Sequence, residues 1–395
     1  MPPLSLYLHI PFCAHRCAYC DFNTYAGLDA LMPAYVDALI HEVAGLAASA
    51  DDSLPVHTVF FGGGTPSLLH AGELARILEA IRTHYALDPQ AEISLEANPG
   101  TLSLAQLEAL RAAGFNRLSL GVQSASPEEL RLLERGHDFP DVIRAVSWAR
   151  QAGFANINLD LIFALPAQTL AAWQRNLELA LGLQPEHLSL YALSIEHGTP
   201  FKEMSARGLF PLPDPDLAAE MYEHAMQRLS AAGYAHYEIS NWARRGPDGA
   251  LLACRHNLQY WRSWPYAGFG AGAHGWLDGH RTANVLAPAA YIERLNRPNA
   301  AFNFPRTPAS VSAERLDARR TMGDTLMMGL RLLEEGVSAQ DFNARFGQSL
   351  DAVYGAAITR LEARQLLEHA GPQQDTLRLT PRGRFLGNQV FMEFV

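Results

Sequence analysis

The sequence predicts an α/β protein built on a partial (βα)6 barrel, followed by a smaller, mainly helical domain. Short runs rich in β-branched and aromatic residues alternate with longer helical patterns, which is typical of a parallel sheet. Six strand candidates are found, two fewer than a closed eight-stranded barrel requires. Gly114 and Gly153 each follow a helical pattern and mark the joint to the next strand.

The strand candidates are short, and turn residues flank them. They cover residues 4–10, 56–61, 92–97, 116–122, 156–163 and 187–193. The helical patterns cover residues 32–48, 71–85, 104–113, 139–152, 170–181 and 214–232. Because ligands bind at the carboxyl ends of parallel strands, the residues that follow each strand are the first candidates for a functional site.

The chain is expected to contain three consecutive parts. Residues 1–235 form the barrel. Residues 236–304 are rich in Trp, Tyr, Gly and His without clear periodicity, and are expected to be irregular. Residues 305–395 hold helical patterns around 313–335, 339–346 and 350–363 and a short strand at 377–379, which indicates a winged-helix-like domain.

Composition and charge narrow the class of protein. With 395 residues, 48% hydrophobic and 18% charged, the chain is typical of a folded globular protein. The net charge of −10 argues against a partner nucleic acid and against charge-driven membrane binding. No run approaches 18 apolar residues, and the first residues lack the basic region of a signal peptide. We therefore expect a cytoplasmic protein without a transmembrane segment.

Three of the four cysteines, Cys13, Cys17 and Cys20, fall within eight positions, whereas Cys254 stands alone. Clustered thiolates select zinc, copper(I) or an iron–sulfur cluster. His9 or His15 could complete a four-ligand zinc site. Three thiolates would instead leave one iron of a [4Fe–4S] cluster without a protein ligand and open to a cofactor or substrate. We favour the cluster.

The run Cys13-Ala-His-Arg-Cys17-Ala-Tyr19-Cys20 resembles the cluster loop of the radical S-adenosylmethionine superfamily. The resemblance implies that the three cysteines hold a [4Fe–4S] cluster whose fourth iron is chelated by S-adenosylmethionine. It also implies that Tyr19 lies near the adenine. Gly62-Gly63-Gly64-Thr65-Pro66 follows the second strand, where glycines allow close approach of the backbone to a ligand, and resembles the edge that binds the methionine moiety.

Several polar residues lie at or near the ends of the later strands. Carboxylates there can accept hydrogen bonds from ribose hydroxyls, and a guanidinium can bind a carboxylate. The resemblance assigns the contacts with S-adenosylmethionine to Tyr7, Tyr19, Gly63, Gly64, Thr65, Glu96, Gln123, Arg135 and Asp160. Ala164 and Ala167 stand where this family usually has glycine, and we expect only a small local adjustment.

A narrower resemblance covers nearly the whole chain. Residues 5–13, 121–124, 135–137, 160–169 and 191–196 resemble the oxygen-independent coproporphyrinogen oxidase family. His256-Asn-Leu-Gln-Tyr260-Trp261 resembles the mark of its haem-chaperone (HemW) branch. The resemblance implies a chaperone that binds haem and transfers it to an acceptor haemoprotein, of the respiratory chain if the family pattern holds.

His256 is the candidate haem ligand because neutral imidazole suits iron, and Tyr260 and Trp261 could supply flat apolar walls. A structural histidine among aromatic neighbours is the alternative, and His274 is a second candidate ligand. The number of axial ligands stays open.

Two rival functions remain at this point. The first is oxidative decarboxylation of coproporphyrinogen III through a 5′-deoxyadenosyl radical, and the second is radical chemistry on another substrate. The oxidase pattern has a fourth cysteine two places after the third, where this sequence has Phe22, and it has a longer segment before the first cysteine. Both differences favour the chaperone, and no catalytic residue is assigned. Cleavage of S-adenosylmethionine, peripheral membrane contact and oligomeric state stay open.

Overall fold

The computed structural model describes residues 2–395, which form two compact units. The first unit runs to Arg228 and also contains Pro265–Glu314. The second contains Leu229–Trp264 and Arg315–Val395. This division differs from the predicted segments 1–235, 236–304 and 305–395, because residues 265–304 belong with the barrel and residues 236–264 do not.

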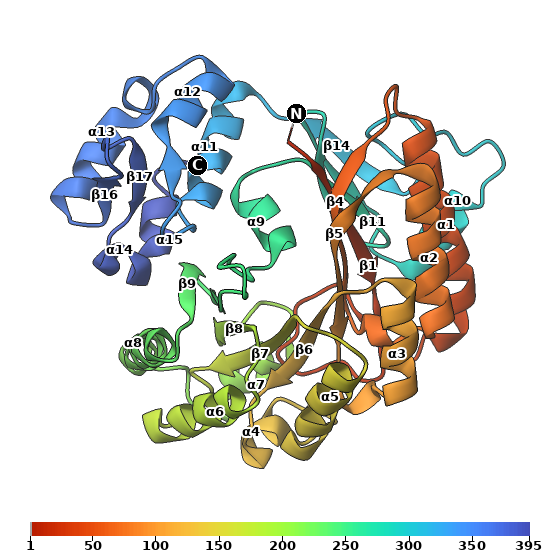
Figure 1. Cartoon of the computed structure of the whole chain (residues 1–395), viewed down its shortest axis with the longest axis horizontal. Helices are drawn as coiled ribbons and strands as arrows, with labels where there is room; N and C mark the ends of the chain where they lie inside the picture. The colour runs from red at the N-terminus through yellow and green to blue at the C-terminus, as the bar shows by residue number, and fades with distance from the viewer. Residues whose placement is uncertain (1) are drawn as a thin grey trace. The chain divides into compact units, whose positions relative to one another are not determined.

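The first unit is a partial barrel of six parallel strands with helices on its outer face (Figure 1). The strands lie side by side in the order β1(Leu4–Ile10), β4(Pro55–Gly63), β5(Ala86–Ala97), β6(Arg117–Gln123), β7(Ile157–Phe163) and β8(His187–Ala192). The helices are α1(Met32–Ala48), α2(Ala71–His84), α3(Leu104–Ala113), α5(Phe139–Gln151), α6(Leu170–Gly182) and α8(Pro215–Ala231). The predicted alternation of six strands with helices is confirmed.

Local sequence signals explain where these helices lie and end. The apolar face of α2 repeats at helical spacing and buries Leu74, Ile77, Leu78 and Ile81. Each such side chain contributes about 1.5–3 kcal/mol by leaving water. Asp138 caps the first turn of α5: its side chain accepts from the Asp141 amide, and the Asp141 side chain accepts from the Asp138 amide.

A second set of strands continues the sheet beyond β1. β11(Tyr266–Phe269) pairs with β1 in parallel, and β12(His274–Leu277), β13(His280–Asn284) and β14(Ser310–Arg315) follow in order. The sequence suggested irregular structure for residues 236–304, and the strands found here are only four to six residues long, too short to show a clear pattern. Gly270 has φ +98°, and a Cβ there would lie 2.5 Å from the carbonyl oxygen of His9.

Glu42, in the middle of α1, holds this returning segment against the barrel. Its Oε2 accepts hydrogen bonds from the Gly270 amide (2.9 Å) and the Tyr291 hydroxyl (2.7 Å). Its Oε1 accepts from Asn284 Nδ2 (2.8 Å) and the Thr307 hydroxyl (2.6 Å). Desolvation raises the pKa of Glu42, while these four donors favour its charged form.

Asp29–Ala48, which includes α1, is the one helix within residues 2–395 that is long and apolar enough to cross a membrane. Core helices of globular proteins pass the same test. Here α1 packs against α2 and α10(Pro288–Leu295), and it buries Tyr35 and Glu42. We therefore assign α1 to the core of the first unit.

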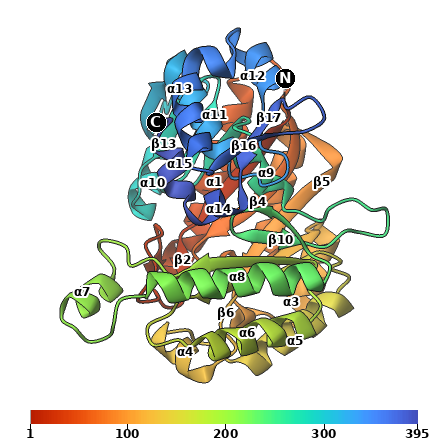
Figure 2. The ribbon, with the colours of Figure 1, turned by 90° about the vertical axis from the view of Figure 1, so that its left-hand side faces the viewer.

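The second unit contains a small hairpin, the helix α9(Arg255–Trp261) and the C-terminal helices. The hairpin pairs β9(Ala235–Glu238) with β10(Asn241–Ala243). These helices are α11(Ala318–Gly329), α12(Ala339–Phe346) and α13(Leu350–Ala363). They precede the hairpin β16(Leu367–Ala370)–β17(Thr376–Leu379), which β15(Val337–Ser338) extends (Figure 2). Leu326, Phe342, Leu361 and Leu377 lie in their shared core. The predicted helical, winged-helix-like domain is confirmed.

Candidate functional site

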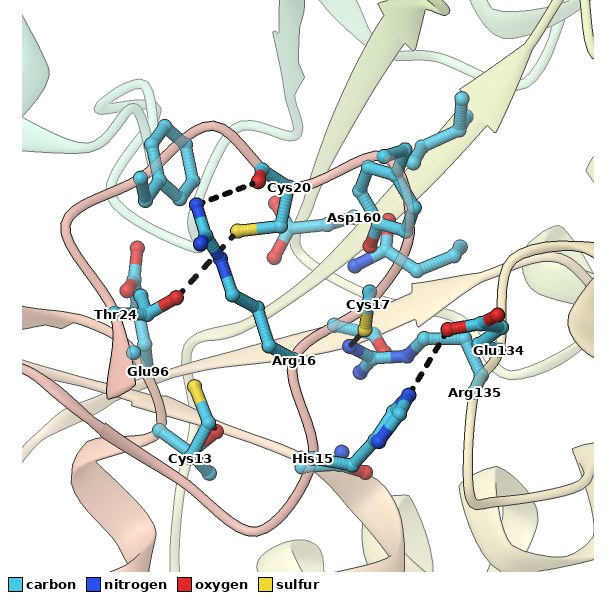
Figure 3. A pocket seen from close by; sticks show the side chains of 18 of the residues that line it. Cys13, His15, Arg16, Cys17, Cys20, Thr24, Glu96, Glu134, Arg135 and Asp160 are labelled. Carbon is cyan, nitrogen blue, oxygen red and sulfur yellow. Dashed lines mark hydrogen bonds and ion pairs between the residues drawn. The ribbon is translucent and has the colours of Figure 1, made fainter. Parts of the chain in front are cut away.

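The three clustered cysteines lie on the loop that follows β1 and line one cavity of about 480 Å³ (Figure 3). The cavity is at the carboxyl ends of the parallel strands, and its wall includes residues from the ends of β4 to β8. The site therefore lies where the strand order predicts it. Cys254 is buried directly before α9 in the second unit and is not part of the cavity wall.

Each clustered thiol has a polar neighbour. The Thr65 hydroxyl lies 3.7 Å from Cys13 Sγ, and Arg135 Nη1 lies 3.5 Å from Cys17 Sγ. The Thr24 hydroxyl lies 4.0 Å from Cys20 Sγ. Desolvation raises the pKa of Cys13 and of Cys20, and donors at these positions stabilise thiolates against that effect.

The surrounding histidines do not complete a zinc site. His9 Nε2 donates to the carbonyl oxygen of Asn23 (2.9 Å), so Nδ1 accepts from the Tyr7 hydroxyl (2.9 Å), and both ring nitrogens are engaged. His15 pairs instead with Glu134. Within residues 2–395, no three His, Cys, Asp or Glu side chains are gathered around a single ion position. Three thiols spread around a cavity fit a cluster with a separate iron for each thiolate.

The glycines at the end of β4 lie close to other parts of the chain. The Gly64 amide donates to the Ile10 carbonyl at 2.9 Å, and a Cβ on Gly64 would lie 2.6 Å from Phe12 O and 3.0 Å from Cys13 Sγ. Gly63 has φ +115°, and its amide donates to Glu96 Oε2 at 3.0 Å. The close approach that these glycines permit is therefore, in the first place, to other parts of this chain: Gly64 to Phe12 and Cys13, and Gly63 to the His9 ring.

This contact predicts that Gly64→Ala disturbs the cluster and not only the cofactor pocket. The added Cβ must displace the Phe12 carbonyl or Cys13, because carbon atoms do not tolerate a 2.6 Å contact. We expect the iron content after anaerobic reconstitution to fall by more than half. Gly72→Ala is the matched control, since a Cβ at Gly72 meets nothing within 4 Å. A normal iron content in Gly64→Ala would contradict the prediction.

Two carboxylates, Glu96 and Asp160, line the same cavity. Desolvation, with a smaller contribution from the charge of Asp160, raises the pKa of Glu96 to about 8. Desolvation also raises the pKa of Asp160, whose oxygens accept hydrogen bonds from Ser119 Oγ (3.0 Å) and Asn158 Nδ2 (2.8 Å). The cavity thus presents two carboxyl groups and, from Arg135, one cation.

The structure brings all but one of the predicted cofactor contacts to this cavity. Its wall includes Tyr19, Gly63, Gly64, Thr65, Glu96, Gln123, Arg135 and Asp160. Tyr7 is not part of the wall, and its hydroxyl binds His9. The role of each residue toward S-adenosylmethionine stays a prediction.

Tyr191, Ser194 and Glu196 also belong to the wall. They lie in the run 191–196 that carries the family resemblance, but the sequence assigned them no contact with the cofactor. Ala164 and Ala167 have φ +57° and +60°, so the backbone keeps the left-handed conformation that glycine favours.

His256 lies in the second unit and is 1% exposed. Its Nε2 is 2.9 Å from the Tyr260 hydroxyl, one turn further along α9, and the two rings meet edge to face. Trp261 is covered by the Arg331 guanidinium at 5.3 Å from the ring centre. His274, the second candidate, is exposed on β12 in the first unit. In this conformation His256 does not present Nε2 to solvent.

Comparisons with known proteins agree with this architecture. Residues 7–180 match the radical SAM superfamily, and residues 316–386 match the HemN C-terminal domain. The protein named heme chaperone HemW of Bacillus subtilis is 37% identical over 99% of both chains, and that of Mycobacterium tuberculosis (strain H37Rv) is 39% identical over 98% of this chain and 94% of its own.

A solved structure described as coproporphyrinogen III oxidase (HemN) from Escherichia coli, a radical SAM enzyme, shares the fold. Its TM-score is 0.81 at 23% identity, and the match covers 99% of this chain and 90% of that one. The oxidase and this chain therefore share the fold. The two relatives at 37% and 39% identity, which match nearly the whole chain, are both named heme chaperone HemW. The chain belongs to the HemW family of the radical SAM superfamily.

Proposed function

We propose that this protein is a haem chaperone, which binds haem and passes it to an acceptor haemoprotein. The observation that carries the proposal is the relationship over 99% of both chains to a protein named heme chaperone. Phe22 supports it, since this side chain stands where the oxidase pattern has a fourth cysteine, lines the cavity and is 64% exposed.

The cavity of the first unit fits a [4Fe–4S] cluster with S-adenosylmethionine. Cys13, Cys17 and Cys20 would each hold one iron, and the fourth iron would take the amine and carboxylate of S-adenosylmethionine. When bound, the pair supplies one-electron chemistry. The chain's own part is to hold Cys13 near the Thr65 hydroxyl and Cys17 near the Arg135 guanidinium, and to offer carboxylate acceptors to the nucleoside.

Haem binding through His256 Nε2 requires the Tyr260 hydroxyl to move away from that nitrogen, because the metal and the hydroxyl cannot occupy the same side of the ring. We expect Tyr260→Phe, which keeps the ring, to raise haem affinity about fivefold by removing about 1 kcal/mol of competing hydrogen bond. We expect His256→Ala to weaken or redistribute binding. Haem titration followed by its Soret absorbance measures both. Equal affinity in the two variants and the wild type would remove His256 from the haem site.

The same preparation decides between chaperone and oxidase. With reductant and S-adenosylmethionine present, we expect haem binding and no conversion of coproporphyrinogen III to protoporphyrinogen IX. Multiple-turnover decarboxylation would overturn the chaperone in favour of the oxidase. Protein that neither binds haem nor turns over coproporphyrinogen would favour radical chemistry on another substrate.

We also propose a cytoplasmic location and an acceptor haemoprotein of the respiratory chain. The net charge of −10 fits a protein that does not depend on nucleic acid or on anionic lipid for its binding. Pull-down of respiratory haemoproteins by the haem-loaded protein, with haem-free protein as the control, tests the acceptor.

A further inference from the structure

We propose that Asn158, with His187 behind it, is a positioning residue that fixes the Asp160 carboxylate for the ribose hydroxyls of S-adenosylmethionine. The inference rests on the proposed binding of that cofactor in the first unit. Asn158 and Asp160 are two residues apart on β7, so their side chains lie on the same face of the sheet. Asp160 lines the cavity, whereas Asn158 is 1% exposed behind it.

Both oxygens of Asp160 are held from inside the barrel. Asn158 Nδ2 donates to Asp160 Oδ1 at 2.8 Å and to Ser119 Oγ at 2.7 Å. Because the Ser119 hydroxyl accepts from Asn158, its own proton goes to Asp160 Oδ2 at 3.0 Å. Asn158 therefore acts on one carboxylate oxygen directly and on the other through Ser119.

A second layer fixes the orientation of the Asn158 amide. Its Oδ1 accepts from His187 Nδ1 at 2.6 Å and from the Ser189 hydroxyl at 3.2 Å, both on the neighbouring strand β8. Strand register places His187 opposite Asn158. With both donors on the oxygen, the amide nitrogen must face Asp160. Desolvation and then the charge of Arg117 hold the pKa of His187 well below its usual range, which keeps the ring neutral.

These contacts limit the further hydrogen bonds that the Asp160 carboxylate can accept. An ionised carboxylate has about four lone-pair positions, and Asn158 and Ser119 occupy two of them. The lone pairs that stay free on the cavity side suit a pair of adjacent hydroxyls such as those of ribose. A carboxylate already held in place loses little side-chain freedom when the ligand binds.

The test is a double-mutant cycle on cluster-loaded protein with S-adenosylmethionine as the probe, measured by calorimetry. We expect Asn158→Leu, which keeps the volume and removes the amide, to weaken binding about tenfold. In an Asp160→Ala background the same change should have no further effect. Methionine, which has no ribose, serves as the second probe, and its binding to the reduced cluster, followed by electron paramagnetic resonance, should not change. Additive losses in the cycle, or equal losses for both probes, would overturn the positioning role.

His187 offers a second pair of variants should Asn158→Leu fold poorly. The amide nitrogen of Asn can replace His187 Nδ1 as the donor, so His187→Asn should retain wild-type affinity. His187→Leu should lose about threefold, because it leaves the Asn158 amide free to turn. Equal affinities in the two variants would overturn the role of His187. Wild-type protein that binds no S-adenosylmethionine would contradict the cofactor assignment itself, and the haem titration tests the chaperone function independently.

Discussion

Replacing Cys13, Cys17 or Cys20 with alanine is expected to abolish the iron–sulfur cluster. Anaerobically reconstituted wild-type protein should hold about four irons and four sulfides per chain, since three thiolates suit a [4Fe–4S] cluster with one open iron. The three sulfurs lie around one cavity and have different polar neighbours, so no thiol can substitute for another. Iron and sulfide analysis with the visible absorption spectrum measures the loss.

Cys254→Ala is the matched control for these three variants. Cys254 is buried in the second unit and contributes nothing to the cavity wall, so its removal should leave the iron content unchanged. Stoichiometric zinc without iron in carefully anaerobic wild-type protein would overturn the cluster assignment.

The largest loss of folding stability is expected for Glu42→Gln. All four groups around this carboxylate are donors, and an amide would turn its own NH2 group toward two of them. Buried donors without an acceptor cost about 1–3 kcal/mol each, so we expect a loss of about 3 kcal/mol. Denaturant unfolding of the cluster-free protein, followed by circular dichroism, measures the change.

Tyr291→Phe is the milder comparison, because it removes one donor and leaves three. The pH dependence gives a second readout. Desolvation raises the pKa of Glu42 in the folded state, so the folded protein binds more protons than the unfolded chain between the two pKa values. The Glu42 contribution to stability should therefore fall as pH rises through that window, and Glu42→Gln should lack this component. Equal stability of Glu42→Gln and wild type would contradict the assigned network.

The sequence was sufficient for the parts of the molecule in which one short pattern determines the structure. The spacing of Cys13, Cys17 and Cys20 after an apolar strand located both the site and the edge of the sheet on which it lies. The strand ends then led to Glu96 and Asp160, because parallel strands bring their carboxyl ends together.

The sequence did not predict the contacts between segments that are far apart in the chain. β11 pairs with β1, but its four residues include a glycine and show no alternation of their own. Gly64 was expected to make room for a ligand; it does line the cavity, and the sequence did not show that a Cβ there would also clash with Phe12 and Cys13. The burial of His256 and its bond to Tyr260 depend on how α9 is packed in its unit. The two-residue spacing of Asn158 and Asp160 is visible in the sequence. The hydrogen bond between their side chains becomes informative only when the neighbouring strands are placed beside β7.

The pairing of β1 with β11 has a consequence for the synthesis of the chain. β1 is synthesised before both of its neighbouring strands, and β4 can cover only one of its two edges. The roughly 250 residues that separate β1 from β11 take about 10–50 s to translate at about 5–20 residues per second. During that interval, the strand that leads into the cysteine loop has an open hydrogen-bonding edge, where another chain could pair with it. Closing the edge beside the cysteine loop therefore depends on residues that are translated roughly 250 positions after β1.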